Sequence, residues 1–218
     1  GGIRINAGVT LTIEKNVVLT ITNKDDLIQV LGTLVIKEGA TINMAEESYI
    51  EVKTNGVLKV EGTATDSVTF TGTNWGRNNS SGSGAGISLG SSGLTKSSIK
   101  YAKIINKSHN SNDWIVSLTD GSIIENSEIS GSRMGITVVG STLKNSKIHN
   151  INQRALESLG GSTVTGNEIY DVNLDEETFA AVTVDGGTFS SNRVYSSSNT
   201  SNNWGINVNS NATVEYNT

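Results

Sequence analysis

The sequence predicts an all-β solenoid in which one chain winds into a parallel β-helix of roughly nine coils. The first observation is a recurring polar line, seen as "GSTLKNSKIH" (140–149), "GGSTVTGNEIY" (160–170) and "GGTFSSNRVY" (186–195). The second is its period, because the aligned positions 123, 142, 163, 188 and 213 are 19, 21, 25 and 25 residues apart. The third is the absence of proline from all 218 residues, as expected where nearly every strand donates hydrogen bonds to both neighbours.

The aligned lines place similar residues in columns. A threonine and then a large apolar residue occupy 142–143, 163–164, 188–189 and 213–214, and asparagine closes the following turn at 167, 192 and 217. Successive turns of a strand-built coil lie about 4.8 Å apart, so each residue meets its own copy in the next coil. We therefore expect an asparagine ladder at this turn, where asparagine tolerates left-handed backbone and hydrogen-bonds to the next copy.

A second recurring element alternates apolar and polar residues at period two, which indicates β-strand. It reads "WIVSL" (114–118), "MGITVV" (134–139), "RALESL" (154–159) and "FAAVTV" (179–184). Each repeat thus supplies at least two short strands joined by Gly, Ser and Asn turns. A single repeat is too small to bury its apolar face alone, so stacked copies must share one continuous core.

We expect one domain over residues 1–218, with N-terminal coils 1–76, a flexible insert 77–84 and C-terminal coils 85–218. The insert, "RNNSSGSG", has the composition of a flexible linker. A solenoid end that nothing covers exposes its core and a strand edge, so end-to-end self-association is one expected interaction.

Composition excludes several classes of partner. The formal net charge is −5 and no run of Lys and Arg occurs, which argues against nucleic acid. No apolar stretch approaches the roughly 18 residues of a membrane span. The chain has no cysteine, so disulfides contribute nothing to its stability.

The N-terminal third contains the steps "VEGT" (60–63), "VTFT" (68–71) and Trp75-Gly76. With these steps the chain resembles right-handed parallel β-helix proteins of the pectin-lyase-like type, many of them bacterial surface proteins. Left-handed hexapeptide helices need a strict six-residue period, which is absent. The resemblance implies a right-handed coil and an extracellular or cell-surface location.

Enzymes of this fold act on acidic polysaccharides, but the short sequence steps that mark polygalacturonases do not occur here, and we assign no catalytic residue. The best acidic cluster comprises Asp171, Asp175, Glu176 and Glu177. Carboxylates are suitable calcium ligands, so this cluster is either a Ca²⁺ site or a solvated acidic loop. No other cofactor is expected.

An aromatic column is the second candidate site. His149, Tyr170 and Tyr195 each follow an inward-pointing residue, so alternation directs the three rings outward, about 4.8 Å apart. Rings in such a row have two possible roles: they bind the apolar faces of sugars, or they stack on one another and stabilise an exposed sheet. Trp75, beside the insert, is a further candidate for the binding surface.

The chain also resembles the tāpirins, cellulose-adhering surface proteins of thermophilic plant-degrading bacteria. The likeness lies in the β-helical architecture, the coils rich in Asn, Ser and Thr, and a long loop leaving a regular core. It implies a non-catalytic extracellular adhesion module that binds insoluble plant polysaccharide such as cellulose. The alternatives are a calcium-dependent polysaccharide lyase or epimerase, and a purely structural surface stalk.

Overall fold

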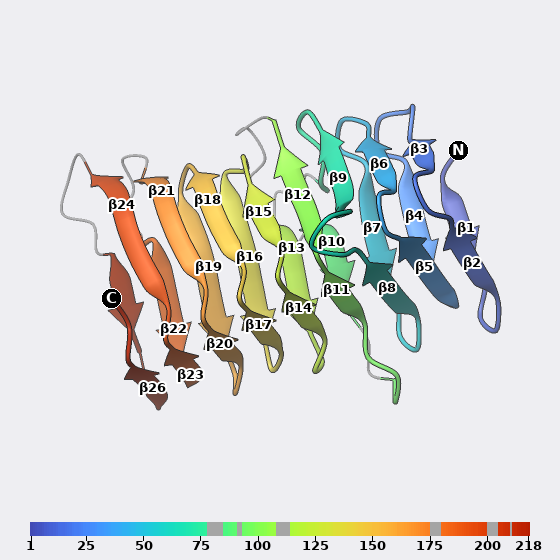
Figure 1. Ribbon diagram of the computed structural model, residues 1–218. Helices are drawn as coiled ribbons and strands as arrows, with labels where there is room; N and C mark the ends of the chain where they lie inside the picture. Colours follow the sequence, from blue (N-terminus) through green and yellow to red (C-terminus); the bar gives the residue numbers. More distant parts are fainter. Residues whose placement is uncertain (78–84, 91–92, 108–113, 175–179, 200–204, 210) are drawn as a thin grey trace.

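The computed structural model describes the chain except residues 78–84, 91–92, 108–113, 175–179, 200–204 and 210. The described residues form 26 strands arranged in three sheets, and all neighbouring strands are parallel (Figure 1). The predicted all-β class and the parallel β-helix are confirmed. Within the described part, no helix has the length and apolar character needed to cross a membrane.

Each sheet takes one strand from successive coils. Sheet A contains β1 (Ile3–Ile5), β4 (Leu27–Val30), β7 (Tyr49–Val52), β10 (Ala85–Leu89), β13 (Trp114–Thr119), β16 (Met134–Val139), β19 (Arg154–Leu159), β22 (Val182–Asp185) and β25 (Ile206–Val208). Sheet B contains β2 (Thr10–Ile13), β5 (Thr33–Lys37), β8 (Val57–Glu61), β11 (Ser98–Lys100), β14 (Ile123–Glu125), β17 (Thr142–Lys144), β20 (Thr163–Thr165), β23 (Gly187–Ser190) and β26 (Ala212–Glu215). Sheet C contains β3 (Val18–Thr20), β6 (Thr41–Met44), β9 (Val68–Gly72), β12 (Ala102–Asn106), β15 (Glu128–Ser130), β18 (Lys147–Ile151), β21 (Glu168–Leu174) and β24 (Arg193–Asn199).

The chain passes through sheets A, B and C in turn and then begins the next coil, so the nine strands of sheet A correspond to the nine predicted coils. The first eight coils have three strands each, in keeping with the expected minimum of two, because the recurring polar line contains two strands; the ninth coil has β25 and β26. In "GGTFSSNRVY", β23 and β24 are separated only by Ser191 and Asn192. A turn this short does not interrupt the apolar periodicity, so the sequence pattern merges the two strands.

The residues that the repeats place in one column pair with each other on neighbouring strands of the sheets. Thr142, Thr163, Thr188 and Thr213 pair successively in sheet B. In sheet C, Ile148 pairs with Ile169 and Ile169 with Val194. A slip of one residue would turn a whole apolar strand face outward, so the buried face fixes this register.

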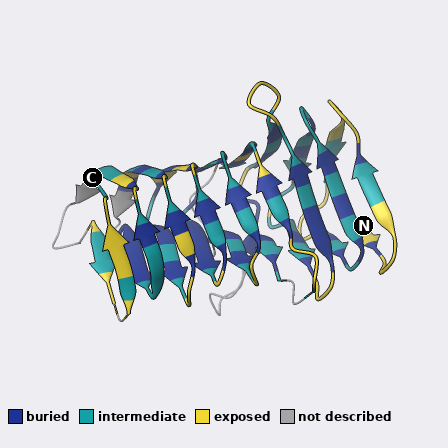
Figure 2. Ribbon diagram, turned by 60° about the horizontal axis from the view of Figure 1, so that its bottom comes forward, coloured by how far each residue is buried: buried dark blue, intermediate teal, exposed yellow. Residues whose placement is uncertain are grey.

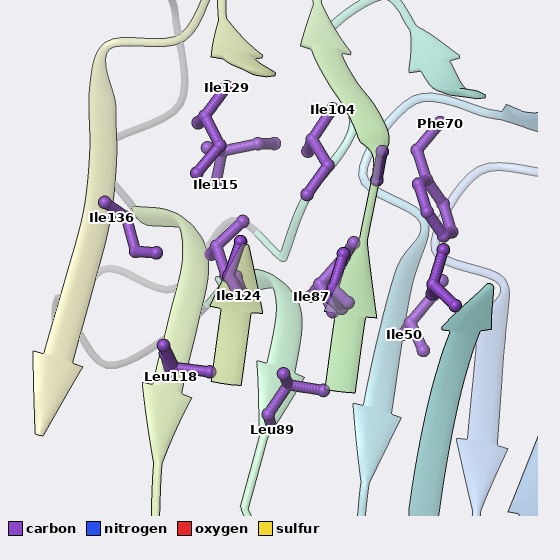
Figure 3. Packing of buried hydrophobic residues seen from close by; sticks show 14 of the residues in the cluster. Ile50, Phe70, Ile87, Leu89, Ile104, Ile115, Leu118, Ile124, Ile129 and Ile136 are labelled. Carbon is purple, nitrogen blue, oxygen red and sulfur yellow. The ribbon is translucent and has the colours of Figure 1, made fainter. Parts of the chain in front are cut away.

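The core is a continuous column of aliphatic side chains inside the coil. Ile87, Leu89, Leu118 and Ile129 are fully buried there, and Figure 3 shows them directed into the space between the sheets. Phe70 fills the same column in a coil nearer the N-terminus. Figure 2 shows buried and intermediate residues along the inner strands, and exposed residues at many of the turns and on the strands at both ends.

The corner between sheets B and C has a hydrogen-bond ladder, as predicted, although the left-handed residue is not the asparagine of the ladder. Asn167 Nδ2 donates to Asn192 Oδ1 at 2.9 Å, and Asn192 Nδ2 donates to Asn217 Oδ1 at 3.2 Å. The left-handed backbone falls one residue earlier, for example at Ser191 with φ of 56°. Asparagine therefore suits this position because its side chain both accepts and donates hydrogen bonds.

The ladder continues toward the N-terminus with serine in place of asparagine. The Ser146 amide donates to Asn167 Oδ1 at 2.9 Å, and the Ser127 amide donates to Ser146 Oγ at 3.1 Å. The Ala102 amide donates in turn to Ser127 Oγ at 3.0 Å. Every side chain of the ladder thus accepts a backbone N–H from the preceding coil that would otherwise be buried without a partner.

The outer face of sheet B carries a column in which positive and negative side chains alternate. In register, Lys37 pairs with Glu61, Glu61 with Lys100, Lys100 with Glu125 and Glu125 with Lys144. Glu125 contacts both of its lysines at 2.8 Å. Hydrogen bonds from Lys100 and then Lys144 hold the pKa of the Glu125 carboxyl below its ordinary value of 4.5. Alternation avoids the repulsion that identical charges would have at the coil spacing.

We expect the Asn192→Ala substitution to lower the free energy of unfolding by about 3 kcal/mol. It removes the acceptor of the Asn167 amide and the donor to the Val164 carbonyl, and both backbone groups are buried. The matched control is Asn43→Ala, which removes only an exposed hydrogen bond to Thr20. Urea denaturation followed by circular dichroism measures both. Equal losses in the two variants would show that the ladder contributes nothing special.

We expect Glu125→Gln to destabilise the fold by about 1 kcal/mol at neutral pH. Because the folded pKa of Glu125 is lowered, its contribution is present above its ordinary pKa and is lost as pH falls through the lowered value. The difference in melting temperature between wild type and variant should therefore shrink in acid. Glu215→Gln, in the same column without an ion pair among the described residues, is the control. A difference that persists undiminished at low pH would contradict the ionic account.

Candidate functional site

The candidate site lies on the outer face of sheet C, in the C-terminal half of the molecule. His149 on β18, Tyr170 on β21 and Tyr195 on β24 pair in register across three successive coils. The residue before each ring, such as Ile169 before Tyr170, is directed into the core. Strand alternation therefore places the three rings outside, as the sequence predicts.

The three rings stack face to face. The His149 and Tyr170 ring centroids are 4.8 Å apart with planes 5° from parallel, and those of Tyr170 and Tyr195 are 5.3 Å apart and 12° from parallel. Of the two roles that the sequence left open, mutual stacking is the one that the structure shows. The faces of Tyr170 are turned toward its two neighbours, so a ligand meets the ring edges and the phenolic hydroxyl groups.

Charged groups lie at both ends of this aromatic stack. The guanidinium carbon of Arg193 is 4.3 Å from the centroid of the Tyr195 ring, a cation–π distance. At the other end, His149 Nε2 lies 3.1 Å from Glu128 Oε1. These contacts fix the outer rings of the stack, which favours a rigid surface.

Beside the aromatic stack runs a second column of alternating charge, which the sequence analysis missed. In register, Lys103 pairs with Glu128, Glu128 with Lys147, Lys147 with Glu168 and Glu168 with Arg193. We call these five residues the charged column. Their signal in the sequence is the residue just before each inward isoleucine or valine, where the sign of the charge reverses from one repeat to the next.

The environment of the aromatic stack keeps its polar groups in defined states. Burial raises the pKa of the Tyr170 phenol above its ordinary value. The phenol therefore remains a neutral hydrogen-bond donor at physiological pH. A hydrogen bond to Glu168 raises the pKa of Lys147, and the two side chains are 3.4 Å apart. The face thus presents fixed donors and acceptors in alternation.

A hollow of about 270 Å³ opens at the corner where the chain passes from sheet B to sheet C. We call it the corner hollow. It is lined by Ser67, Ala102, Lys103, Asn126, Ser127, Glu128, Asn145 and Lys147. Three of these residues belong to the charged column, so the corner hollow and the candidate site form one continuous surface.

Trp75 does not belong to this surface, and the expectation that it binds ligand there is wrong. Its side chain is fully buried, and its Nε1 donates to the Ile105 carbonyl at 2.9 Å. The ring fills the core at the corner between sheets C and A. Gly86 leaves room for it, since a Cβ at that position would lie 2.8 Å from the indole. Small residues around a tryptophan are the signal that could have predicted burial.

The predicted calcium cluster is only partly within the described residues. Asp171 is exposed, with a left-handed φ of 50°. Asp175, Glu176 and Glu177 lie outside the described residues. Where the chain is described, no group of three or more His, Cys, Asp or Glu side chains is arranged to hold a metal ion.

The predicted insert 77–84 is described only at its first residue. The Arg77 guanidinium carbon is 5.5 Å from the centroid of the Tyr49 ring on sheet A. Residues 78–84 lie outside the described part of the chain. Tyr49 is thus an aromatic ring on a different face from the aromatic stack.

Comparison of the chain with protein-family models and with curated protein sequences gave no match in either case. Function must therefore be inferred from the chemistry of the outer face of sheet C.

Proposed function

We propose that this chain is a non-catalytic adhesion module that binds insoluble plant polysaccharide of the cellulose type, at the cell surface or outside the cell. The observation that supports this most is the register-aligned aromatic stack of His149, Tyr170 and Tyr195 on the outer face of sheet C. A ligand with regularly repeated sugar units suits a surface whose own groups repeat from coil to coil.

In this proposal the ligand contacts the stack at its outer edge. The tyrosine hydroxyls donate to sugar oxygens, and Glu168 and Arg193, on the same strands as Tyr170 and Tyr195, supply further donors and acceptors beside them. Each contact is weak, but the ring positions are already fixed by stacking, by Arg193 and by Glu128. Binding therefore loses little side-chain entropy, and contacts along several coils add up.

The structural stalk is a second candidate, and the stacking geometry itself favours it. Aromatic pairs on neighbouring strands stabilise a sheet without any ligand. The calcium-dependent lyase or epimerase depends on Asp171 and on three acidic residues outside the described part of the chain. No observation on the described residues favours that enzyme.

The first test is a pull-down on microcrystalline cellulose, xylan, chitin and pectin. We expect wild type to bind cellulose and Tyr170→Ala/Tyr195→Ala to lose most of that binding, because both outer hydroxyls and the stack are removed. Tyr49→Ala, which removes a ring from sheet A, is the matched control and should bind as wild type. Circular dichroism verifies that all variants are folded.

Three outcomes of this pull-down would change the assignment. Equal losses in the Tyr49 variant and the double variant would remove sheet C as the binding face. Undiminished binding by the double variant would keep the adhesin but discard the stack. If wild type binds none of the four polysaccharides, the proposal is wrong and the stalk becomes the better assignment.

A second test separates edge contact from contact with ring faces. Tyr170→Phe/Tyr195→Phe preserves the stacked rings and removes only the two hydroxyl groups. Because the ring faces are occupied by one another, we expect each lost hydroxyl to weaken cellulose binding roughly 3- to 10-fold. The melting temperature should stay close to that of wild type. Unchanged affinity in this variant, combined with loss in the alanine variant, would show that apolar ring contact dominates.

A further inference from the structure

The corner hollow exists because the turn between sheets B and C changes length along the molecule. Residues 62–67 separate β8 from β9, whereas only Tyr101 separates β11 from β12. From β14 onward the turn is constant at two residues, beginning with 126–127. Ser67, at the end of the long turn, therefore forms one wall of a depression that the shorter turns after it do not fill.

The charges around the corner hollow oppose both an anion and a cation as its occupant. Lys103 and Lys147 lie on either side of Glu128 in the charged column. An anionic ligand would meet the Glu128 carboxylate, and a cationic ligand would meet two ammonium groups. A neutral ligand with many hydroxyl groups would instead accept hydrogen bonds from the lysines and donate to the carboxylate.

The remaining walls supply uncharged donors and acceptors. Asn126 and Asn145 occupy the left-handed position of their turns, with φ of 52° and 51°, and both line the hollow together with Ser67. Lys103 forms no ion pair with a described residue and is exposed at the rim. Its ammonium group is therefore available to a ligand.

The size and the position of the hollow restrict the ligand further. A volume of about 270 Å³ is at or below the lower limit of sites for drug-sized ligands, roughly 300 Å³, and suits one sugar residue. The hollow lies toward the corner, two strand positions from the line of the aromatic stack, as Lys147 is from His149. A polysaccharide backbone running along the stack as far as His149 would pass beside the hollow without entering it.

We propose that the corner hollow binds a neutral side-chain sugar of a branched polysaccharide whose backbone lies along the aromatic stack. Lys103 and Asn126 donate hydrogen bonds to the sugar hydroxyls, and the Glu128 oxygen not engaged by His149 accepts one. This assignment rests on the proposed polysaccharide-binding function and specifies its substrate class. It predicts that the protein binds a substituted polysaccharide chain more tightly than a linear chain with the same backbone.

The test is isothermal titration of two neutral oligosaccharides with the same backbone, a linear cello-oligosaccharide and a branched xyloglucan oligosaccharide. We expect wild type to bind the branched ligand roughly 3- to 10-fold tighter, as one or two additional hydrogen bonds provide. Lys103→Gln/Asn126→Gly should lose this preference and keep its affinity for the linear ligand. Glycine suits the left-handed turn at position 126, as it does at Gly166.

The matched control is Lys107→Gln/Ser191→Gly. It makes the same change of charge at the end of β12 and removes a polar side chain from the same turn position, where Ser191 has φ of 56°, but neither residue lines the hollow. We expect this variant to retain the preference for the branched ligand. An equal loss in both variants would assign the effect to charge or turn flexibility and overturn the inference.

The outcomes separate this inference from the proposed function. Equal affinity of wild type for linear and branched ligands would overturn the side-chain site and leave the adhesin intact. Loss of linear binding in the Lys103→Gln/Asn126→Gly variant would also overturn it, because the hollow would then hold the backbone. Tighter binding of a galacturonate oligosaccharide than of either neutral ligand would refute the neutral class. If neither neutral oligosaccharide binds, and cellulose is not retained in the pull-down, both proposals fail.

Discussion

The interaction on which this structure depends is the contact of each residue with its own copies one coil before and one coil after. Parallel, in-register stacking repeats every position at the strand spacing of about 4.8 Å. A residue type therefore persists in a column only if it is compatible with a copy of itself or with an alternating partner. Isoleucine satisfies this condition in the core, asparagine at the corner, and lysine alternating with glutamate on the outer faces.

The same constraint decides what the outer face can offer a ligand. Rings one coil apart stack on each other, as Tyr170 does on both neighbours, so their faces contribute to stability and their edges remain for recognition. In the proposed function, stability and binding therefore depend on different atoms of one side chain. A surface built this way is rigid before any ligand arrives, which suits the additive contacts of adhesion.

The columns could be predicted from the sequence because residues one repeat apart in a solenoid pair with each other on neighbouring strands. The pairing of Thr163 with Thr188 follows directly from the repeat. Four features were not predicted. The third strand of the coils from β14 onward is hidden because the turn before it is only two residues long. The charged column requires the pairing of Lys103 with Glu128 across coils of unequal length. The burial of Trp75 depends on space left by Gly86 in a neighbouring strand, and the plane of a ring has no signature in a residue pattern.

The lengths of the turns explain why the candidate surfaces gather at one corner. From β14 onward the turn between sheets B and C is always two residues long, whereas the other two turns and the strands themselves vary in length, and together they account for coils of 19 to 25 residues. A ladder of hydrogen bonds through Ser146, Asn167 and Asn192 holds the constant corner. Residues directly after it, including the charged column and the aromatic stack, are thereby kept in register however long the distant loops become. Where the turn shortens from residues 62–67 in one coil to Tyr101 alone in the next, the surface becomes hollow. In the proposed function, this corner therefore offers a regular face for a polymer backbone and, where its turn shortens from six residues to one, a hollow for a substituent.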